Sequence, residues 1–299
     1  MIISALKSSI ASDERSPIHI DTIKTLVELG VEVWFEEDIG DGINVKNQTF
    51  VEAGLKKHSR EDCLKNGNLI ITNQALNNDD LEFVKSNTTI LGMVNPFSNQ
   101  DLINKCSSAK INLVSMEFIP RITRAQKMDV LSSQANLAGY VAVIESAKHL
   151  STALPMMMTA AGTLKPAKVF VIGVGVAGLQ AIATAKRLGA RVEAFDTRDV
   201  VEEQVNSLGA KFVKIDLGET GETDQGYAKE LTEEQINKQK ELQSKVCERS
   251  DIVITTAQLF GRPAPMLIDN STIDKMMSGS VIFDMAVESG GNVEGSEVD

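Results

Sequence analysis

The stretch Val169-Phe-Val-Ile-Gly173-Val-Gly175-Val-Ala-Gly178-Leu-Gln180 decides the fold of the chain. A run of mostly β-branched residues opens into the pattern GxGxxG and then into a helix-forming segment, the layout of a dinucleotide-binding unit. Gly173 allows a tight turn, Gly175 lets the backbone approach a pyrophosphate, and Gly178 allows close packing of helix on strand. Unpaired N–H groups at the helix N-terminus attract phosphate. The stretch predicts a site for a nicotinamide or flavin dinucleotide, although purely structural glycine turns share the spacing.

The residues that follow complete a β-α-β unit. Residues 181–188 continue a helix that Gly189 closes, and residues 191–195 (RVEAF) form the next strand. Asp196 ends this strand, about twenty residues after the glycines, where a carboxylate accepts hydrogen bonds from the adenosine ribose and repels a 2′-phosphate. NAD(H) is therefore favoured over NADP(H), although Arg198 offers a charge that a phosphate could use. The alternative is that Asp196 is a solvated carboxylate at a strand end.

Composition narrows the class of protein. The 299 residues are 42% hydrophobic and contain no unbroken apolar run of the roughly 20 residues that a membrane span needs. The formal net charge of −11 argues against nucleic acid and anionic lipid surfaces as partners. Cys63, Cys106 and Cys247 are far apart and form no CxxC motif, so we expect neither a disulfide framework nor a zinc site.

Strand-like and helix-like segments alternate along the whole chain. This alternation predicts an α/β protein with two doubly wound, parallel-sheet (Rossmann-like) domains, residues 1–130 and 131–299. Residues 131–150 have the length and composition of one long connecting helix, and we expect a cleft between the domains that it joins. A shorter helix is expected over residues 20–29. Strands are expected at residues 2–5, 31–35, 69–71, 89–91 and 111–114, and near Val169, Val192, Phe212, Ile252 and Val281.

Two further segments have interpretations of their own. Residues 216–240 are polar, contain glycine and are longer than an ordinary connection between helix and strand. They form either a mobile lid with Gly226 as hinge and Tyr227 as its amphipathic aromatic, or a solvated insertion followed by an exposed helix. Met156, Met157 and Met158 are predicted to pack in the core rather than to form a metal site or partner surface.

The reactive side chains of the chain favour a site that orients its ligands over one that transfers protons. His19, His58 and His149 are the only histidines, none stands in a nucleophile motif, and no carboxylate pair has ligand spacing, so hydrolysis and metal chemistry have little support and no metal is expected. Residues 121–134 (RITRAQKMDVLSSQ) are dense in directional hydrogen-bonding groups at the domain boundary. They could clamp a carboxamide and ribose, or form a linker whose charges pair with each other.

Four stretches carry a resemblance to a known family. They are residues 116–140 (MEFIPRITRAQKMDVLSSQANLAGY), 155–189 (PMMMTAAGTLKPAKVFVIGVGVAGLQAIATAKRLG), 226–230 (GYAKE) and 281–291 (VIFDMAVESGG). In these stretches the chain resembles the NAD(H)-binding component (alpha subunit, domain I) of proton-translocating NAD(P) transhydrogenase, which is related in fold to alanine dehydrogenase. The resemblance is strong over residues 110–292 and weaker in the N-terminal third.

The resemblance implies a function and a set of partners. A member of this family passes hydride from NADH directly to NADP+ on a partner, the beta subunit with its NADP(H)-binding domain, while a membrane component translocates protons. It implies a homodimer that is cytoplasmic and peripheral to the inner membrane through partner subunits. It also implies that the N-terminal domain lacks a C-terminal return segment, because family members continue beyond the point that corresponds to Asp299.

The resemblance also assigns site residues by position. Arg121, Gln126, Asp129 and Ser132 fall on the nicotinamide-side loop, where the first three act by positioning. The cofactor-binding set is Gly173, Gly175, Val176 and Gly178 at the pyrophosphate, Asp196, Thr197 and Arg198 at the adenosine ribose, Gly226, Tyr227 and Gln239 in and after the lid, and Gln258, where the family often has an aliphatic residue.

Two rival functions stay open from the sequence. Hydride transfer between two nicotinamides releases no substrate proton, so positioning suffices without a catalytic His or Lys. An NAD-dependent alanine dehydrogenase must bind and deprotonate an amino acid, and the family's substrate Lys and His fall here on Asn73 and Met93, which leaves Arg15 from that pocket. The other rival is a module that binds NAD without turnover.

Overall fold

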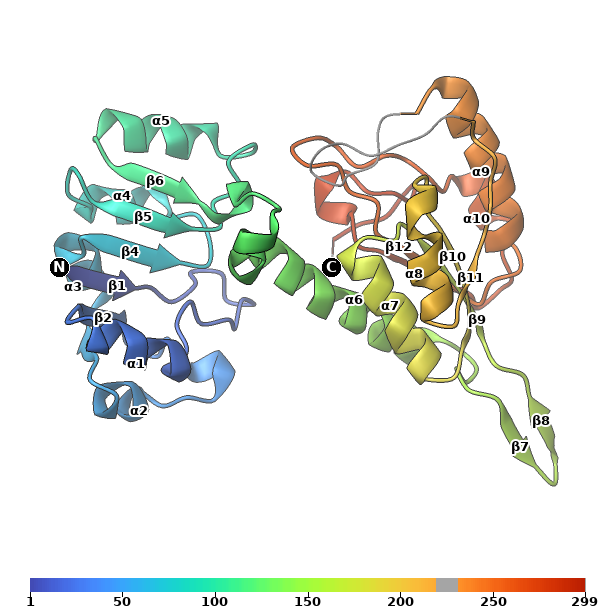
Figure 1. Ribbon diagram of the computed structural model, residues 1–299, viewed down its shortest axis with the longest axis horizontal. Coiled ribbons are helices and arrows are strands. Elements are labelled where there is room, and N and C mark those ends of the chain that lie inside the picture. Colours follow the sequence, from blue (N-terminus) through green and yellow to red (C-terminus); the bar gives the residue numbers. More distant parts are fainter. Residues whose placement is uncertain (219–230, 299) are drawn as a thin grey trace. The chain divides into compact units, whose positions relative to one another are not determined.

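The computed structural model describes residues 1–218 and 231–298. The chain divides into two compact units, Met1–Val130 and Leu131–Asp299 (Figure 1). Within the described ranges, no helix is long and apolar enough to cross a membrane.

The first unit contains a six-stranded parallel sheet in the order β3-β2-β1-β4-β5-β6. Side chains alternate across it, so that Ile3 and Ala5 pack on one face with Ile23 and Phe50, while Ile70 packs on the other face. Helices α1 and α2 therefore cover one face, and α3 and α5 cover the other. The elements are β1 (Ile2–Ala5), α1 (Ile20–Glu28), β2 (Glu32–Glu36), α2 (Asn47–Glu52), β3 (Lys56–His58), α3 (Arg60–Asn66), β4 (Leu69–Thr72), α4 (Asn78–Phe83), β5 (Thr89–Gly92), α5 (Gln100–Ser108) and β6 (Asn112–Ser115).

The second unit contains a five-stranded parallel sheet in the order β11-β10-β9-β12-β13. Helices α6, α7 and α8 contribute to the core on the face of Val169 and Val171, and α9 contributes to the core on the face of Phe170 and Ile172. The elements are α6 (Val130–His149), β7 (Met157–Thr159), β8 (Gly162–Leu164), β9 (Lys168–Ile172), α7 (Val176–Arg187), β10 (Arg191–Phe195), α8 (Glu202–Ser207), β11 (Lys211–Phe212), α9 (Glu233–Cys247), β12 (Ile252–Thr255), α10 (Asn270–Ile273) and β13 (Val281–Asp284).

The strand order in each unit reverses beside the first strand of its sheet. In the second unit, β10 lies on one side of β9 and β12 lies on the other. Ligands of open α/β sheets bind at the carboxyl ends of the strands at such a reversal. Two doubly wound parallel sheets are present, so the predicted fold class is confirmed.

The methionine prediction was wrong. Met156, Met157 and Met158 are 58%, 48% and 72% exposed, because β7 and β8 pair antiparallel with each other and lie outside the two main sheets. Figure 1 shows this hairpin extending away from the body of the second unit. Apolar residue type indicates only that a surface tends to be covered, and it does not say that the same chain covers it.

The alternative of an exposed helix after the long insertion holds for only part of α9. Helix α9 begins at a capping box formed by Thr232 and Gln235, and it buries Val246 and Cys247 against the sheet. The packing was not predicted from the sequence, because the mean hydropathy of the helix is low. Two of its buried residues, Gln239 and Gln243, are polar. Gly226 and Tyr227, on which the lid prediction rests, lie outside the described residues.

The three cysteines are buried, so we expect their thiols to react slowly in the native protein. Burial raises the pKa of the Cys63 and Cys247 thiols to about 12 and also raises the pKa of Cys106. Since the thiolate is the reactive form, we expect no fast labelling by a maleimide at pH 8 and three labels per chain in denaturant. Peptide mass spectrometry along a urea series should assign Cys63 and Cys106 to opening of the first unit and Cys247 to the second. A thiol that labels in native buffer at the rate of a free thiol would contradict this expectation.

Candidate functional site

The glycine-rich turn joins β9 to α7 at the strand-order reversal. Gly173 has φ +96°, and a Cβ there would lie 2.6 Å from the hydroxyl of Thr256. A Cβ on Gly178 would lie 1.9 Å from the carbonyl oxygen of Gly173, so no side chain fits between helix and turn. Gly175 differs, because its φ of −82° suits any residue and none of the residues that the structure describes lies within 4 Å of a Cβ placed there. Packing explains Gly173 and Gly178, whereas no contact with the described residues requires a glycine at position 175.

Helix α7 starts at Val176, and its N-cap Gly175 makes no side-chain cap hydrogen bond. The N–H groups of a first helical turn have no partner within the helix and carry a partial positive charge. The partly exposed Val176 therefore stands at an N-terminus that is suited to a phosphate group.

Asp196 lies just beyond the end of β10 and is only 8% exposed. One carboxylate oxygen accepts from the backbone N–H of Val174 at 2.7 Å and from Nη2 of Arg198 at 2.8 Å. The other accepts from the backbone N–H and Nε of Arg198, both at 2.9 Å. A carboxylate has about four acceptor positions, and all four are used here. The alternative of a solvated strand-end carboxylate is therefore excluded by the structure.

This arrangement gives Asp196 a role that the sequence did not indicate. It ties the glycine-rich turn, through Val174, to the loop after β10, and it neutralises Arg198, whose Nη2 also donates to the Val174 carbonyl at 3.3 Å. A ribose hydroxyl can bond to this carboxylate only by replacing a donor that is already there. Thr197 lies between the two charged residues and is half-buried.

Two residues that sequence reasoning missed hold the loops on the other side of the turn. Buried Asn292 accepts from the Ala257 N–H at 3.1 Å and donates to the Ala257 carbonyl at 2.9 Å and to the Pro265 carbonyl at 2.8 Å. Asp284, at the end of β13, accepts from Thr255 Oγ1 and from four further donors. The run VIFDMAVESGG, which contains Asp284 and ends one residue before Asn292, was the available signal, but no roles were assigned there.

These loops reach the glycine-rich turn through Thr256. Its hydroxyl donates to the Gly173 carbonyl at 3.0 Å, next to the Ala257 that Asn292 holds. Gln258 follows, and its Nε2 donates to the Met285 carbonyl at 3.0 Å. Asn292 and Asp284 therefore position the segment that forms one wall beside the turn.

The predicted site residues fall into four groups. The carboxyl edge of the second unit's sheet brings together Gly173, Gly175, Val176, Gly178, Asp196, Thr197, Arg198 and Gln258. Gln239 is buried on α9, and Ser132 lies in the first turn of α6, where Gly139 further along packs against the Ala177 carbonyl of α7. The first unit holds Arg121, Gln126 and Asp129. Gln126 lies in the 3-10 helix Thr123–Met128, and the other two lie on either side of it. Arg121 and Gln126 are exposed, while Ala125 of the same helix is buried. Gly226 and Tyr227 are outside the described residues.

We looked for a metal site in the part of the chain that the structure describes. No group of three or more His, Cys, Asp or Glu side chains there is placed to hold a metal ion.

Comparison with known proteins identifies the family. The model for the alanine dehydrogenase/PNT N-terminal domain matches residues 7–138, and the model for the C-terminal domain of the same family matches residues 142–299. The chain belongs to the alanine dehydrogenase/PNT family. Within this family it is similar to an NAD(P) transhydrogenase subunit alpha of Rickettsia prowazekii (strain Madrid E), with 44% identity over 304 residues that cover 100% of this chain and 79% of that protein.

Solved structures of alanine dehydrogenase/PNT proteins agree. The crystal structure of transhydrogenase from Sinorhizobium meliloti matches with a TM-score of 0.89 at 41% identity, over 99% of this chain and 82% of that one. An L-alanine dehydrogenase matches with a TM-score of 0.83 at 20% identity, over 100% of this chain and 78% of that one, which shows a shared fold. The predicted resemblance to transhydrogenase alpha subunits, with alanine dehydrogenase as a relative in fold, is confirmed.

Proposed function

We propose that this chain binds NAD(H) at the carboxyl edge of the second unit's sheet and exchanges hydride with NADP(H) bound on a partner subunit. The observation that carries the proposal is the turn at Gly173–Gly178, where packing excludes side chains at two glycines while Gly175 faces open space. The buried Asp196, paired with Arg198, favours a nucleotide with a free 2′-hydroxyl. Relatives named NAD(P) transhydrogenase subunit alpha support the assignment.

The partners follow from the same relatives. The words "subunit alpha" in their name imply further subunits, and we propose a beta subunit that carries NADP(H) and a membrane component that translocates protons. The chain would then be cytoplasmic and peripheral to the inner membrane through those subunits.

The exposed hairpin supports the proposed homodimer. Met157 on β7 and Leu164 on β8 are register partners and both are about half exposed, which is an apolar surface suited to a second copy of the chain. We expect Met157→Ser with Met158→Ser to shift sedimentation from dimer to monomer, with an unchanged circular dichroism spectrum. Met277→Ser is a control on another exposed methionine. A double variant that sediments as the parent does would remove the hairpin from the interface.

The residues of the first unit's polar segment are proposed to act by positioning. Arg121, Gln126 and Asp129 would orient the nicotinamide ring, since hydride transfer between two nicotinamides needs alignment and no proton donor. We expect Gln126→Ala and Asp129→Ala to slow single-turnover hydride transfer by about tenfold or more, with a smaller loss in NADH affinity. Equal losses of rate and affinity would assign both residues to binding alone.

An amino-acid dehydrogenase finds little support in the first unit. Arg15, which that chemistry would use on a substrate carboxylate, already pairs with Asp13 through Nε at 2.7 Å and Nη2 at 2.9 Å, and this contact lowers the pKa of the Asp13 carboxyl. Asn73 donates to the Arg15 carbonyl at 2.9 Å and carries no basic amine.

The test is transfer of a labelled hydride. The chain is mixed with NADH that carries deuterium at both C4 positions and with an NADP+-loaded partner subunit, and mass spectrometry follows deuterium in NADPH. We expect direct transfer of the label, with no transfer when either protein is omitted. Label-free NADPH, or alanine-dependent reduction of NAD+ by the chain alone, would overturn the proposal. Tight NADH binding without any transfer would leave a non-catalytic NAD-binding module.

A further inference from the structure

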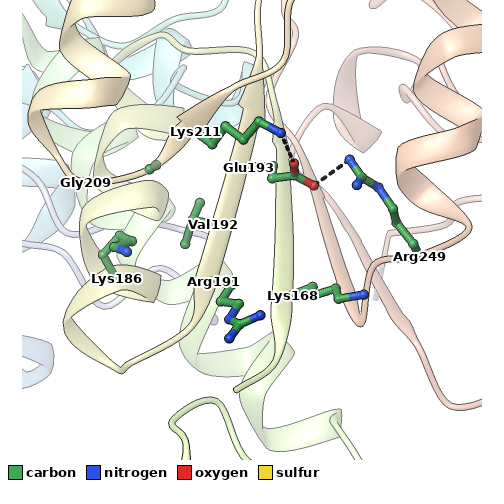
Figure 2. Close-up of a pocket in the computed structure, with 9 residues that line it drawn as sticks. Lys168, Lys186, Arg191, Val192, Glu193, Gly209, Lys211 and Arg249 are labelled. Carbon is green, nitrogen blue, oxygen red and sulfur yellow. Dashed lines mark ion pairs between the residues drawn. The ribbon is translucent and has the colours of Figure 1, made fainter. Parts of the chain in front are cut away.

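A basic pocket lies at the amino edge of the second unit's sheet, opposite the edge that carries the glycine-rich turn. Lys168 begins β9, Arg191 begins β10 and Lys211 begins β11, so the parallel register gathers three cations at one edge. Lys186, near the end of α7, and Arg249, after α9, complete the set. The five cations line a cavity of about 420 Å³ (Figure 2).

Charge in this pocket is strongly unbalanced. Glu193 is the one carboxylate among the described residues that line it. It pairs with Arg249 at 2.7 Å and with Lys211 at 3.5 Å, and Figure 2 shows these two cations on either side of it. Asp251 stands next to the pocket, where it accepts from the backbone N–H of Lys168 at 2.7 Å. Even with both acids counted, three positive charges remain in excess.

Three cations of the pocket stand apart from Glu193. In the ranges that the structure describes, no carboxylate forms an ion pair with the side chains of Lys168, Lys186 or Arg191. Gly209 has φ +75°, and a Cβ placed there would lie 3.5 Å from Cε and 3.9 Å from Nζ of Lys186, so the end of the Lys186 side chain reaches this turn at the pocket wall. Such convergence of cations is unusual in a chain of net charge −11, because like charges repel unless an anion compensates them.

We propose that this pocket binds a small anion with two phosphate groups. Each phosphate monoester carries about 1.5 to 2 negative charges at neutral pH, so two such groups bring about three to four against the excess of three, while a monocarboxylate brings one. The fork of Arg191 and the ammonium groups of Lys168 and Lys186 are the donors that phosphate oxygens prefer. The strand β9 separates this pocket from the glycine-rich turn by about 15 Å, so the two sites are distinct.

The experiment is calorimetric titration of the whole chain with pyrophosphate at constant ionic strength, in the presence of saturating NADH so that the glycine-rich turn is covered. We expect one pyrophosphate per chain. Lys168→Gln with Arg191→Gln should weaken it by about tenfold or more, because two charge-assisted contacts are lost. Lys24→Gln with Lys85→Gln makes the same charge change on exposed lysines of the first unit and should leave it unchanged.

Three results of the titrations would overturn the proposal, and a fourth comes from lipid vesicles. They are no saturable pyrophosphate binding, equal weakening in both double variants, and binding that vanishes when NADH is added. Vesicles of phosphatidylcholine with phosphatidylglycerol distinguish a lipid headgroup from a free anion, and binding to these vesicles without binding to pyrophosphate would also count against it. If NADH does not bind at all, the comparison of the two double variants still decides whether the basic pocket holds pyrophosphate.

Discussion

Asp196→Asn is expected to relax the preference for NADH and to destabilise the second unit. The carboxylate accepts four hydrogen bonds and balances the charge of Arg198, whose side chain is only 14% exposed. An amide can accept at one atom only, and its NH2 group would face donors. Removing one partner of a buried ion pair costs about 3 kcal/mol, which thermal unfolding should detect.

The change in nucleotide preference has a separate origin. Without the charge on Asp196, Arg198 is available to pair with a 2′-phosphate, and the carboxylate no longer repels it. We expect the ratio of NADPH to NADH affinity to rise by about tenfold, measured by fluorescence titration of both nucleotides. Asp199→Asn is the matched control, because it removes the same charge from an exposed side chain three residues away.

Two outcomes would contradict this assignment. An unchanged ratio in folded Asp196→Asn would place the ribose elsewhere, and an equal rise in Asp199→Asn would reduce the effect to net charge. If Asp196→Asn does not fold, Arg198→Gln tests the same contact from the other side. It removes two side-chain donors from the carboxylate, so NADH should bind at least as tightly as before while NADPH binds no better.

Much of the fold could be predicted because local pattern and tertiary structure agree. The strand at residues 191–195 matches β10 residue for residue, and the long helix expected at 131–150 is α6, Val130–His149. Strand β3 was missed, because its sequence Lys-Lys-His carries no apolar side chain and its place at the sheet edge needs none. The hairpin was misassigned because burial depends on what covers a surface.

The site was predictable only where a short motif encodes it. The glycines are recognised by spacing, but the saturation of Asp196 depends on the rotamer of Arg198 and on a backbone N–H that lies 22 residues away. Asn292 reaches Ala257 across 35 residues, and the basic pocket gathers residues from Lys168 to Arg249. Such contacts follow from strand order and register, which local periodicity does not specify.

Two substitutions in the glycine-rich turn should separate an effect on stability from an effect on NADH binding. A methyl group at Gly178 meets the Gly173 carbonyl oxygen at 1.9 Å, a backbone atom that cannot rotate away. We expect Gly178→Ala to destabilise the second unit by about 3 kcal/mol, because α7 must move off the turn. A methyl group at Gly175 meets no described residue within 4 Å, and φ −82° suits alanine, so Gly175→Ala should change stability by less than about 1 kcal/mol.

For NADH affinity, the direct effect should come from Gly175→Ala and not from Gly178→Ala. The methyl group of Gly175→Ala occupies the space where a pyrophosphate would meet the backbone, so this well-folded variant should bind NADH about tenfold or more weakly. In Gly178→Ala, NADH affinity should fall only as far as the second unit unfolds. It should recover when stabilising substitutions elsewhere restore the folded state. Urea unfolding and NADH titration of both variants measure the two effects separately. Full NADH affinity in Gly175→Ala would mean that the open space at this turn is not where the dinucleotide lies, since no packing contact competes for it.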